Sequence, residues 1–293
     1  EICACLVGSE MCIRDRLRSV GGSSVNIGQE TQATDVTIVG DIVAGRGTEN
    51  DVAGGSVGIY AAAGSQIFGD VYAGNGGKVS LMLSGGTLEG QIDDYHELAD
   101  STAEADSFRN AAFYDEAGNT LSVKEAGSVH LTLADGSVWT ARGKNFVESL
   151  AFSGASSTVD LSQNENSSLK IGTLSGSNGV FKMKLGKPEA SADGLIHSDM
   201  LYISNVDADS QNQIEVVFAE GVSSFEELDG LRFATSNHVE TTKHLQLKIE
   251  DAGFFNRTLG VELETYQEGD EKNALYNGAD TGCLLYTSPS PRD

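Results

Sequence analysis

The sequence contains little cysteine, proline or positive charge. Its four cysteines all lie near an end of the 293-residue chain, at Cys3, Cys5, Cys12 and Cys283. Both ends read as translated sequencing-library adapters, because LVGSEMCIRD (6–15) and CLLYTSPSPRD (283–293) fit opposite strands of one transposase-type adapter. We therefore predict that residues 1–16 and 283–293 are not native and that the natural segment, 17–282, has no cysteine. This excludes a disulfide framework, a cysteine metal site and a thiol nucleophile.

Positive charge is scarce throughout the chain. Lys and Arg number 19 against 43 acidic residues, which gives a formal net charge of −24. Without the two end segments, which hold three of the basic and four of the acidic residues, the charge is −23. Nucleic-acid binding depends on Lys and Arg neutralising phosphates, so we expect no nucleic-acid partner. An anionic membrane surface is disfavoured for the same reason.

Long apolar runs and aromatic residues are also few. No run of about 18 apolar residues occurs, so we expect no helix that spans a bilayer. Aromatic residues make up 7% of the chain, with a single tryptophan, whereas glycine is abundant at 35 residues. This composition favours many short strands with tight turns over a helical bundle. The natural segment is long enough to bury a large core.

An internal repeat lies near the start of the natural segment. IVGDIVAG at Ile38–Gly45 returns as IFGDVYAG at Ile67–Gly74, 29 residues later, and a weaker copy (LEGQI, 88–92) follows after 21 more. Repeats of this length are typical of solenoids, in which each unit buries its apolar face against its neighbours. Short apolar runs that end in Gly-rich turns, without a helical period, indicate stacked parallel strands. A β-sandwich is the alternative, although its strands should alternate more cleanly.

Residues 93–119 interrupt this pattern. Ser101 to Glu104 match a capping box at a helix start. A narrow apolar stripe follows, made of Ala105, Phe108, Ala112 and Phe113. We predict a short helix on an acidic insertion. Insertions on solenoids often carry binding, but a solvated acidic excursion without a partner explains these residues equally well.

The strand pattern resumes after the insertion. We expect strands at 129–133, 138–141, 149–152, 158–161 and 169–171. Further on, two segments alternate strictly between apolar and polar residues: Leu245, Leu247, Ile249 and then Leu259, Val261, Leu263. This alternation predicts an antiparallel pair joined through 251–257. Such a pair would cap the open end of a solenoid, which otherwise exposes unpaired backbone.

The segment 172–204 carries the most specific pattern. Two strand-like runs, Val180–Leu185 and Met200–Ile203, flank a polar connection; Phe181 follows a Ser-Asn-Gly turn, and Asp199 precedes the second run. Together with the tryptophan-bearing stretch SVWTARGKNFVESLAFSG, this resembles the C-terminal part of a pertactin-like autotransporter passenger domain. The resemblance covers 135–266 well and 36–92 only in general style.

The resemblance implies an all-β chain folded as a right-handed parallel β-helix (solenoid) with a C-terminal antiparallel β cap. We expect β-helix coils over 17–134, with the insertion at 93–119, then C-terminal coils and an autochaperone-like cap over 135–266. Residues 267–282 would begin a linker to an outer-membrane β-barrel, the expected partner of the passenger. The chain would be a surface-exposed or secreted adhesin or display scaffold of a Gram-negative bacterium, with a host-cell, matrix or glycan ligand.

No catalytic, cofactor-binding or metal-ligating residue is predicted, and no cofactor is expected. Gly54–Gly58 matches G-x-S-x-G, but no helix pattern follows Ser56, as a nucleophile elbow requires. The histidines form no metal-ligand pair; they are His96, His130, His197, His238 and His244. Asn205–Gln211 spaces oxygen side chains alternately but lacks the glycine and distal glutamate of an EF-hand loop, so a polar turn explains it.

Adjacent carboxylates such as Asp93 with Asp94 and Glu226 with Glu227 are expected by chance in so acidic a chain, so they do not indicate glycosidase chemistry. We therefore expect no enzyme. Two alternatives stay open: an extracellular β-helix enzyme that degrades polysaccharide, and a non-catalytic stalk of a passenger whose active domain lies upstream.

Overall fold

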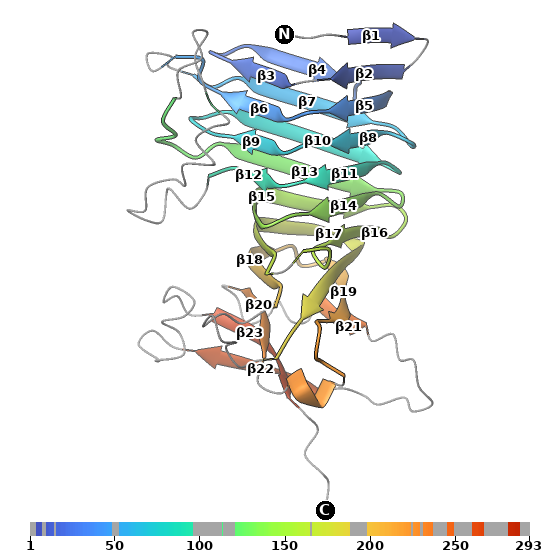
Figure 1. The fold of residues 1–293 in the computed structure, drawn as a ribbon, viewed down its shortest axis with the longest axis vertical. Helices are drawn as coiled ribbons and strands as arrows, with labels where there is room; N and C mark the ends of the chain where they lie inside the picture. Colours follow the sequence, from blue (N-terminus) through green and yellow to red (C-terminus); the bar gives the residue numbers. More distant parts are fainter. Residues whose placement is uncertain are drawn as a thin grey trace, which may run out of the picture.

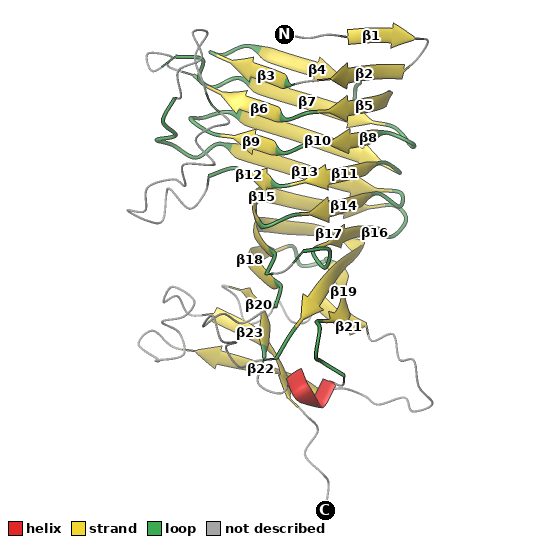
Figure 2. Ribbon diagram, in the orientation of Figure 1, coloured by secondary structure: helices red, strands yellow, loops and turns green. Residues whose placement is uncertain are grey.

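The chain forms a stack of β-coils in a computed structural model, with the N-terminus at one end of the stack (Figures 1 and 2). The structure describes residues 4–7, 10–14, 16–48, 53–95, 113, 121–164, 166–187, 198–223, 225–228, 231–236, 245–248, 260–266 and 281–287. Each coil places its strands directly above those of the next coil, and the apolar side chains point into the space between the sheets. This confirms the predicted all-β, parallel β-helix fold.

Three parallel sheets build the coils. The first sheet contains β2 (Glu10–Arg14), β5 (Asp35–Val39), β8 (Gln66–Phe68), β11 (Thr87–Gly90), β14 (Val138–Ala141), β16 (Ser157–Asp160), β19 (Gln211–Phe218) and β21 (Leu245–Lys248). The second contains β3 (Leu17–Val20), β6 (Ile42–Gly45), β9 (Val71–Ala73) and β12 (Ile92–Asp93). The third contains β4 (Ser24–Ile27), β7 (Ser56–Ala61), β10 (Lys78–Ser84), β13 (Ser128–Ala134), β15 (Lys144–Ser153), β18 (Met200–Val206) and β20 (Arg232–Ser236).

The repeat in the sequence is the register of the coils. Ile38 pairs with Ile67 and Ile67 with Leu88 in the first sheet, so the spacings of 29 and 21 residues are the lengths of successive coils. In the second sheet Ile42 pairs with Val71, which in turn pairs with Ile92. The prediction of stacked parallel units from this repeat is confirmed.

The Gly-Asp step of the repeat forms the corner between the first and second sheets. Asp41 Oδ1 accepts a hydrogen bond from the Asp70 backbone N–H at 3.1 Å, and Asp70 Oδ1 accepts one from the Gln91 N–H at 2.8 Å. The preceding glycines stack closely, because a Cβ added to Gly69 would lie 2.2 Å from the Gly40 carbonyl oxygen. Each corner carboxylate thus satisfies a backbone donor that the turn removes from the ladder.

The core is a column of apolar residues along the stack. One register row of the first sheet runs through residues that are at most 1% exposed: Ile38, Ile67, Leu88, Trp139, Val159 and Phe181. Trp139 fits this row because its indole Nε1–H donates to the Gly90 carbonyl at 3.0 Å. Each such side chain contributes roughly 1.5–3 kcal/mol through burial.

β17 (Ser168–Leu185) differs from its prediction. The sequence predicts two short strands with a Ser-Asn-Gly turn between them, but the structure has one strand of 18 residues. Its first half pairs with β15 and β18 in the third sheet, and its second half with β16 and β19 in the first. The positive φ angles of Gly176 (74°) and Asn178 (71°) bend the strand between the two sheets without ending it.

The C-terminal end also differs from its prediction. β21 pairs in parallel with β19, with Leu247 opposite Ile214, and therefore continues the first sheet. β22 (Gly260–Tyr266) pairs antiparallel with β23 (Thr281–Thr287), which also pairs antiparallel with β20. The predicted pairing of 245–249 with 259–263 is wrong, because alternation marks a half-buried strand but does not determine its partner.

The remaining elements are β1 (Ala4–Val7), which pairs antiparallel with β2, and a 3-10 helix, η1 (Phe225–Leu228). β1, β2 and most of β23 lie in the end segments predicted to be adapter-derived, whose origin stays a prediction. The predicted helix start at 101–104, most of the apolar stripe that follows it and the 251–257 connection lie outside the described residues.

Candidate functional site

The insertion between β12 and β13 packs back onto the outer face of the second sheet. Its described side chains and two strand residues form a hydrophobic cluster that is separate from the core and at most 7% exposed: Val43, Tyr72, Tyr95, Phe113, Leu121 and Val123. Tyr95 and Phe113 meet edge to face, with ring centroids 5.6 Å apart. The base of the insertion is therefore docked on the solenoid.

Glycines of the repeat make room for this docking. A Cβ added to Gly74 would lie 2.9 Å from Phe113 Cζ and 3.1 Å from Val123 Cγ1, and one added to Gly45 would lie 2.5 Å from Phe113 Cε1. Such distances are well below van der Waals contact. The last glycine of each repeat copy is thus required by a phenylalanine of the insertion.

Asn75 fixes the returning end of the insertion. This residue is 3% exposed, and its Oδ1 accepts the Lys124 N–H at 2.8 Å while its Nδ2 donates to the Ser122 carbonyl at 3.0 Å. The Asn75 backbone N–H donates to the Glu125 carbonyl at 2.8 Å. Arg46 adds an ion pair to Glu125 at 2.8 Å. Together with the cluster, these bonds hold the described ends of the insertion on the coils.

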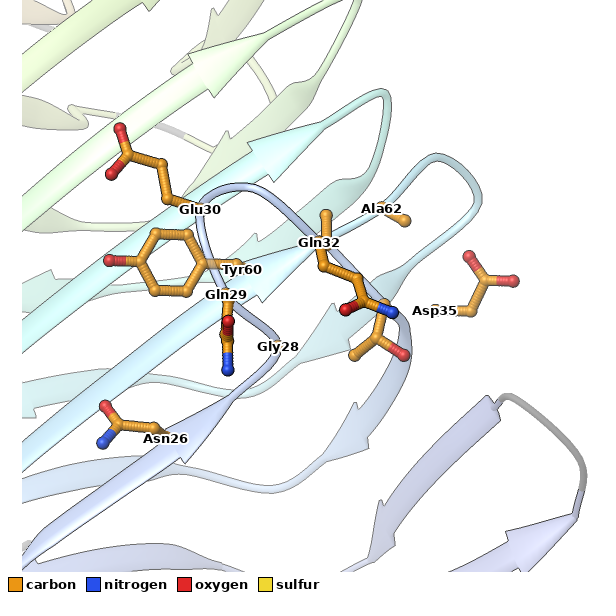
Figure 3. A pocket seen from close by; sticks show the side chains of 10 residues that line it. Asn26, Gly28, Gln29, Glu30, Gln32, Asp35, Tyr60 and Ala62 are labelled. Carbon is orange, nitrogen blue, oxygen red and sulfur yellow. The ribbon is translucent and has the colours of Figure 1, made fainter.

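A polar groove of about 880 Å³ lies at the turn from the third to the first sheet, between β4, β5 and β7 (Figure 3). It is open to solvent and is lined by Asn26, Gly28, Gln29, Glu30, Gln32, Ala33, Thr34, Asp35, Tyr60 and Ala62. In Figure 3 the Tyr60 ring lies at one end with Asn26, Gln29 and Glu30, and Gln32, Asp35 and Ala62 lie toward the other. We call this the Tyr60 groove.

The backbone around the Tyr60 groove is firmly held. Gln29 and Gln32 exchange backbone hydrogen bonds at 2.9 and 3.0 Å, which closes a tight four-residue turn. The Thr34 N–H donates to the Tyr60 carbonyl at 3.1 Å, so the turn is tied to β7. Gly28 (φ 70°) lies against β7, because a Cβ there would be 2.6 Å from the Tyr60 carbonyl oxygen. Sequence reasoning missed this groove, although the polar run from Gln29 to Gln32 between two short strands was a signal.

Asp199, the acidic residue of the sequence pattern, is buried between coils. Its Oδ1 accepts the Ser167 N–H at 2.9 Å and its Oδ2 accepts the Lys184 N–H at 2.6 Å. Burial raises the pKa of the Asp199 carboxyl to about 7, against the two backbone hydrogen bonds, which lower it. Asp199 thus joins both ends of β17 to the start of β18 and serves the architecture of the coils.

Ser56 of the G-x-S-x-G match is the first residue of strand β7. Its N–H donates to the Ser23 carbonyl at 2.9 Å, and a Cβ on the preceding Gly55 would lie 2.1 Å from the Ser19 carbonyl oxygen. The glycine is needed for close backbone approach. Because a strand follows Ser56, the strand-to-helix elbow of a serine nucleophile does not form here.

The other sequence candidates are dispersed. His130 is exposed, with Nδ1 2.8 Å from Ser149 Oγ on the neighbouring strand. The remaining histidines lie outside the described residues. The side chains of Asn205, Asp207 and Asp209 are exposed around a turn in which the Ser210 N–H donates to the Asp207 carbonyl at 3.0 Å. This geometry agrees with the predicted polar turn.

The adjacent carboxylates do not form a catalytic pair in what the structure describes. Asp93 and Asp94 are both buried at the start of the insertion, where Asp93 Oδ1 accepts the Tyr95 N–H at 2.8 Å. Glu227 binds Lys187 Nζ at 2.7 Å, and hydrogen bonds from Lys187 and Ser223 lower the pKa of Glu227 to about 2. Across the described ranges, no three His, Cys, Asp or Glu residues gather in a way that could hold a metal ion.

The register and core define the chain as a parallel β-helix protein. In the part of the chain that the structure describes, no helix is long and apolar enough to cross a membrane. No protein-family model matches the chain, and no curated protein matches it. Among solved structures, the crystal structure of the Haemophilus influenzae Hap adhesin aligns with a TM-score of 0.49 and 14% sequence identity. The alignment covers 95% of this chain and 22% of that chain, so this chain spans about a fifth of its length.

Proposed function

We propose that this chain is part of an autotransporter passenger, a surface-exposed or secreted adhesin or display scaffold. The observation that carries the proposal is the coincidence of a parallel β-helix with the sequence pattern of such passengers at β17 and Asp199. A continuous core and closely stacked corners make the coils a stiff support. Ligand contact then belongs to the segments that leave the coils.

The docked insertion is the strongest candidate for display. Its described ends are held on the solenoid by the packing of Tyr95 and Phe113 and by the hydrogen bonds of Asn75. Ordering this base during folding lowers the entropy that a partner must remove on binding. We propose that adhesion uses this insertion together with other loops.

A cell-adhesion assay with the complete gene tests this function. Residues 96–112 are replaced with a short Gly/Ser linker, which keeps Tyr95 and Phe113 at the docked base. We expect unchanged surface display and a clear loss of adhesion to host cells or matrix. The matched control carries Asp207→Ala and Asp209→Ala in an exposed turn of another coil and should adhere normally.

Two outcomes would contradict parts of the proposal. Full adhesion of the linker variant removes the insertion from the binding function. The passenger assignment itself is refuted if the complete gene product is expressed and folded but is not cleaved by protease added to intact cells.

We further propose that the chain binds rather than catalyses. A polysaccharide-degrading β-helix enzyme would need acidic calcium ligands and a Lys or Arg base in one groove, and the lining of the Tyr60 groove contains no Lys or Arg. Incubation of the purified chain with polygalacturonate and calcium should give no unsaturated product. Sustained turnover, abolished by a chelator, would favour the enzyme instead.

The C-terminal coils are proposed to fold first and to aid secretion as an autochaperone. β17 links the first and third sheets in this region, and Asp199 ties its ends together. If the proposal holds, supplying residues 135–266 as a separate chain should accelerate refolding of a variant that is unfolded in this region. An unchanged refolding rate would contradict the role.

A further inference from the structure

We propose that the Tyr60 groove is a binding site for an uncharged carbohydrate. Five polar side chains line the groove: Asn26, Gln29, Glu30, Gln32 and Asp35. Within the described residues, none of these side chains makes a hydrogen bond or an ion pair that would stabilise the fold. Elsewhere the coils use such side chains at corners, as with Asp41, Asp70 and Asn75. Polar side chains that line a groove and make no contact that stabilises the fold are available to a ligand.

The chemistry of these groups matches sugar hydroxyls. Each carboxamide offers a donor and an acceptor on one planar group, and each carboxylate offers two acceptor oxygens. A pair of neighbouring hydroxyls donates and accepts at the same spacing. The groove therefore offers three amides, from Asn26, Gln29 and Gln32, and two carboxylates, from Glu30 and Asp35, to one polyhydroxylated ligand.

Tyr60 supplies the apolar surface that a sugar ring needs. It alternates with the core residues Ile59 and Ala61, so its side chain points outward from β7 and is partly exposed. A phenol ring presents a flat face for the C–H side of a pyranose and a hydroxyl at its edge. Figure 3 shows this ring on the same side of the groove as Asn26 and Gln29.

Backbone contacts fix the shape of the turn that forms the groove. A Cβ on Gly58 would lie 2.6 Å from Asn26 Oδ1, so the glycine leaves the space in which the Asn26 amide lies. Backbone hydrogen bonds close the turn at Gln29 and Gln32 and tie Thr34 to Tyr60. The backbone of the turn is therefore preorganised, whereas the exposed side chains of Gln29, Glu30 and Gln32 lose rotamer freedom when they bind, which suits a weakly bound sugar.

Charge and backbone pairing select the class of ligand. The lining has two carboxylates and no Lys or Arg, in a chain of net charge −24, so sialylated and sulfated glycans are repelled. A peptide that adds a strand would need a row of unpaired backbone groups, whereas the turn at Gln29 and Gln32 already pairs its own. An uncharged glycan satisfies both conditions.

This proposal names a ligand class for the adhesive function proposed above, and its biological role rests on that function. The test applies the purified 293-residue chain to an array of neutral, sialylated and sulfated glycans. The strongest neutral oligosaccharide is then titrated by calorimetry. We expect binding to neutral members only.

Variants locate the site. Tyr60→Ala should weaken binding at least about tenfold, Tyr60→Phe should retain most of it because the ring is kept, and Gln32→Ala should weaken it about threefold to tenfold. The matched control is Tyr202→Ala, which removes a partly exposed tyrosine from the outer face of β18 in the same sheet and should bind normally. Thermal unfolding of Tyr60→Ala should match that of the parent chain, which shows that the fold is intact.

Several outcomes would overturn the proposal: an array without neutral binding, preference for acidic glycans, binding of a basic peptide in place of sugar, or equal losses in Tyr60→Ala and Tyr202→Ala. A blank array alongside normal adhesion of cells that carry the complete gene defeats the carbohydrate site alone. Absence of adhesion by those cells, with sugar still bound by the purified chain, defeats the adhesive function alone.

Discussion

Replacing Gly74 with Ala should undock the insertion while leaving the solenoid folded. The new Cβ would lie 2.9 Å from Phe113 Cζ and 3.1 Å from Val123 Cγ1, and the rigid phenylalanine ring has to move as a unit. Gly74 has no positive φ, so alanine fits the backbone and the clash with the insertion is the main effect. We expect a loss of about 2–3 kcal/mol, comparable to the burial of one large apolar side chain.

A double-mutant cycle isolates this clash. Phe113→Ala alone should cost about 3–5 kcal/mol, because it empties a fully buried site. In that background Gly74→Ala should be almost neutral, since the ring is gone and the remaining neighbour, Val123 Cγ1 at 3.1 Å, can shift into the space that the ring leaves. The two changes should therefore be non-additive by about 2–3 kcal/mol.

Hydrogen exchange followed by mass spectrometry is the assay. In Gly74→Ala the amide of Lys124, which donates to Asn75 Oδ1, and the amides of Asn75 and Gly76, which donate to the Glu125 and Ala126 carbonyls, should lose protection. The amides of β15 and β17 should be unchanged and serve as the internal control. Additive costs for Gly74→Ala and Phe113→Ala, or loss of protection throughout the stack, would refute the docking argument.

Three further perturbations test the coils. The pKa of Asp199 is raised from 3.8 to about 7, so ionisation of this carboxyl destabilises the fold as pH rises from 4 to 7. Urea unfolding should show up to about 4 kcal/mol more stability at pH 4 than at pH 8. Asp199→Asn should remove this difference. Gly90→Ala, whose Cβ would lie 2.1 Å from the Gly69 carbonyl oxygen, should lower the thermal midpoint by several degrees, and an unchanged midpoint would contradict the stacked corner. Trp139→Phe leaves the Gly90 carbonyl without its indole donor and should cost about 1–3 kcal/mol in denaturant unfolding, with a smaller loss arguing that water replaces the indole.

The docked base of the insertion determines which residues can be deleted without disturbing the fold. A deletion of all of 93–119 would take away Tyr95 and Phe113 and expose Val43 and Tyr72 on the second sheet. Such a deletion tests packing and binding at once. A replacement confined to 96–112 separates the two, because the docked base is kept.

The stack of parallel coils was predictable from the sequence because its signal is local and periodic. The repeat at Ile38 and Ile67 is also the strand register, since each coil stacks equivalent residues directly on one another. Asp199 was likewise recognisable in the sequence pattern, because backbone donors at a corner need an acceptor at a fixed place in the chain.

Only the tertiary structure decided which segments meet. The alternation of Leu245 and Leu247 with polar residues predicts a strand, yet the parallel pairing of β21 with β19 depends on residues more than 30 positions apart. Phe113 reads as one member of a helical stripe, but its place is set by the absent side chains of Gly45 and Gly74. In the Tyr60 groove, Asn26 and Tyr60 are far apart in sequence and meet because β4 and β7 stack. Periodicity along the chain thus determines the scaffold, whereas its surfaces arise from contacts between coils that no local pattern records.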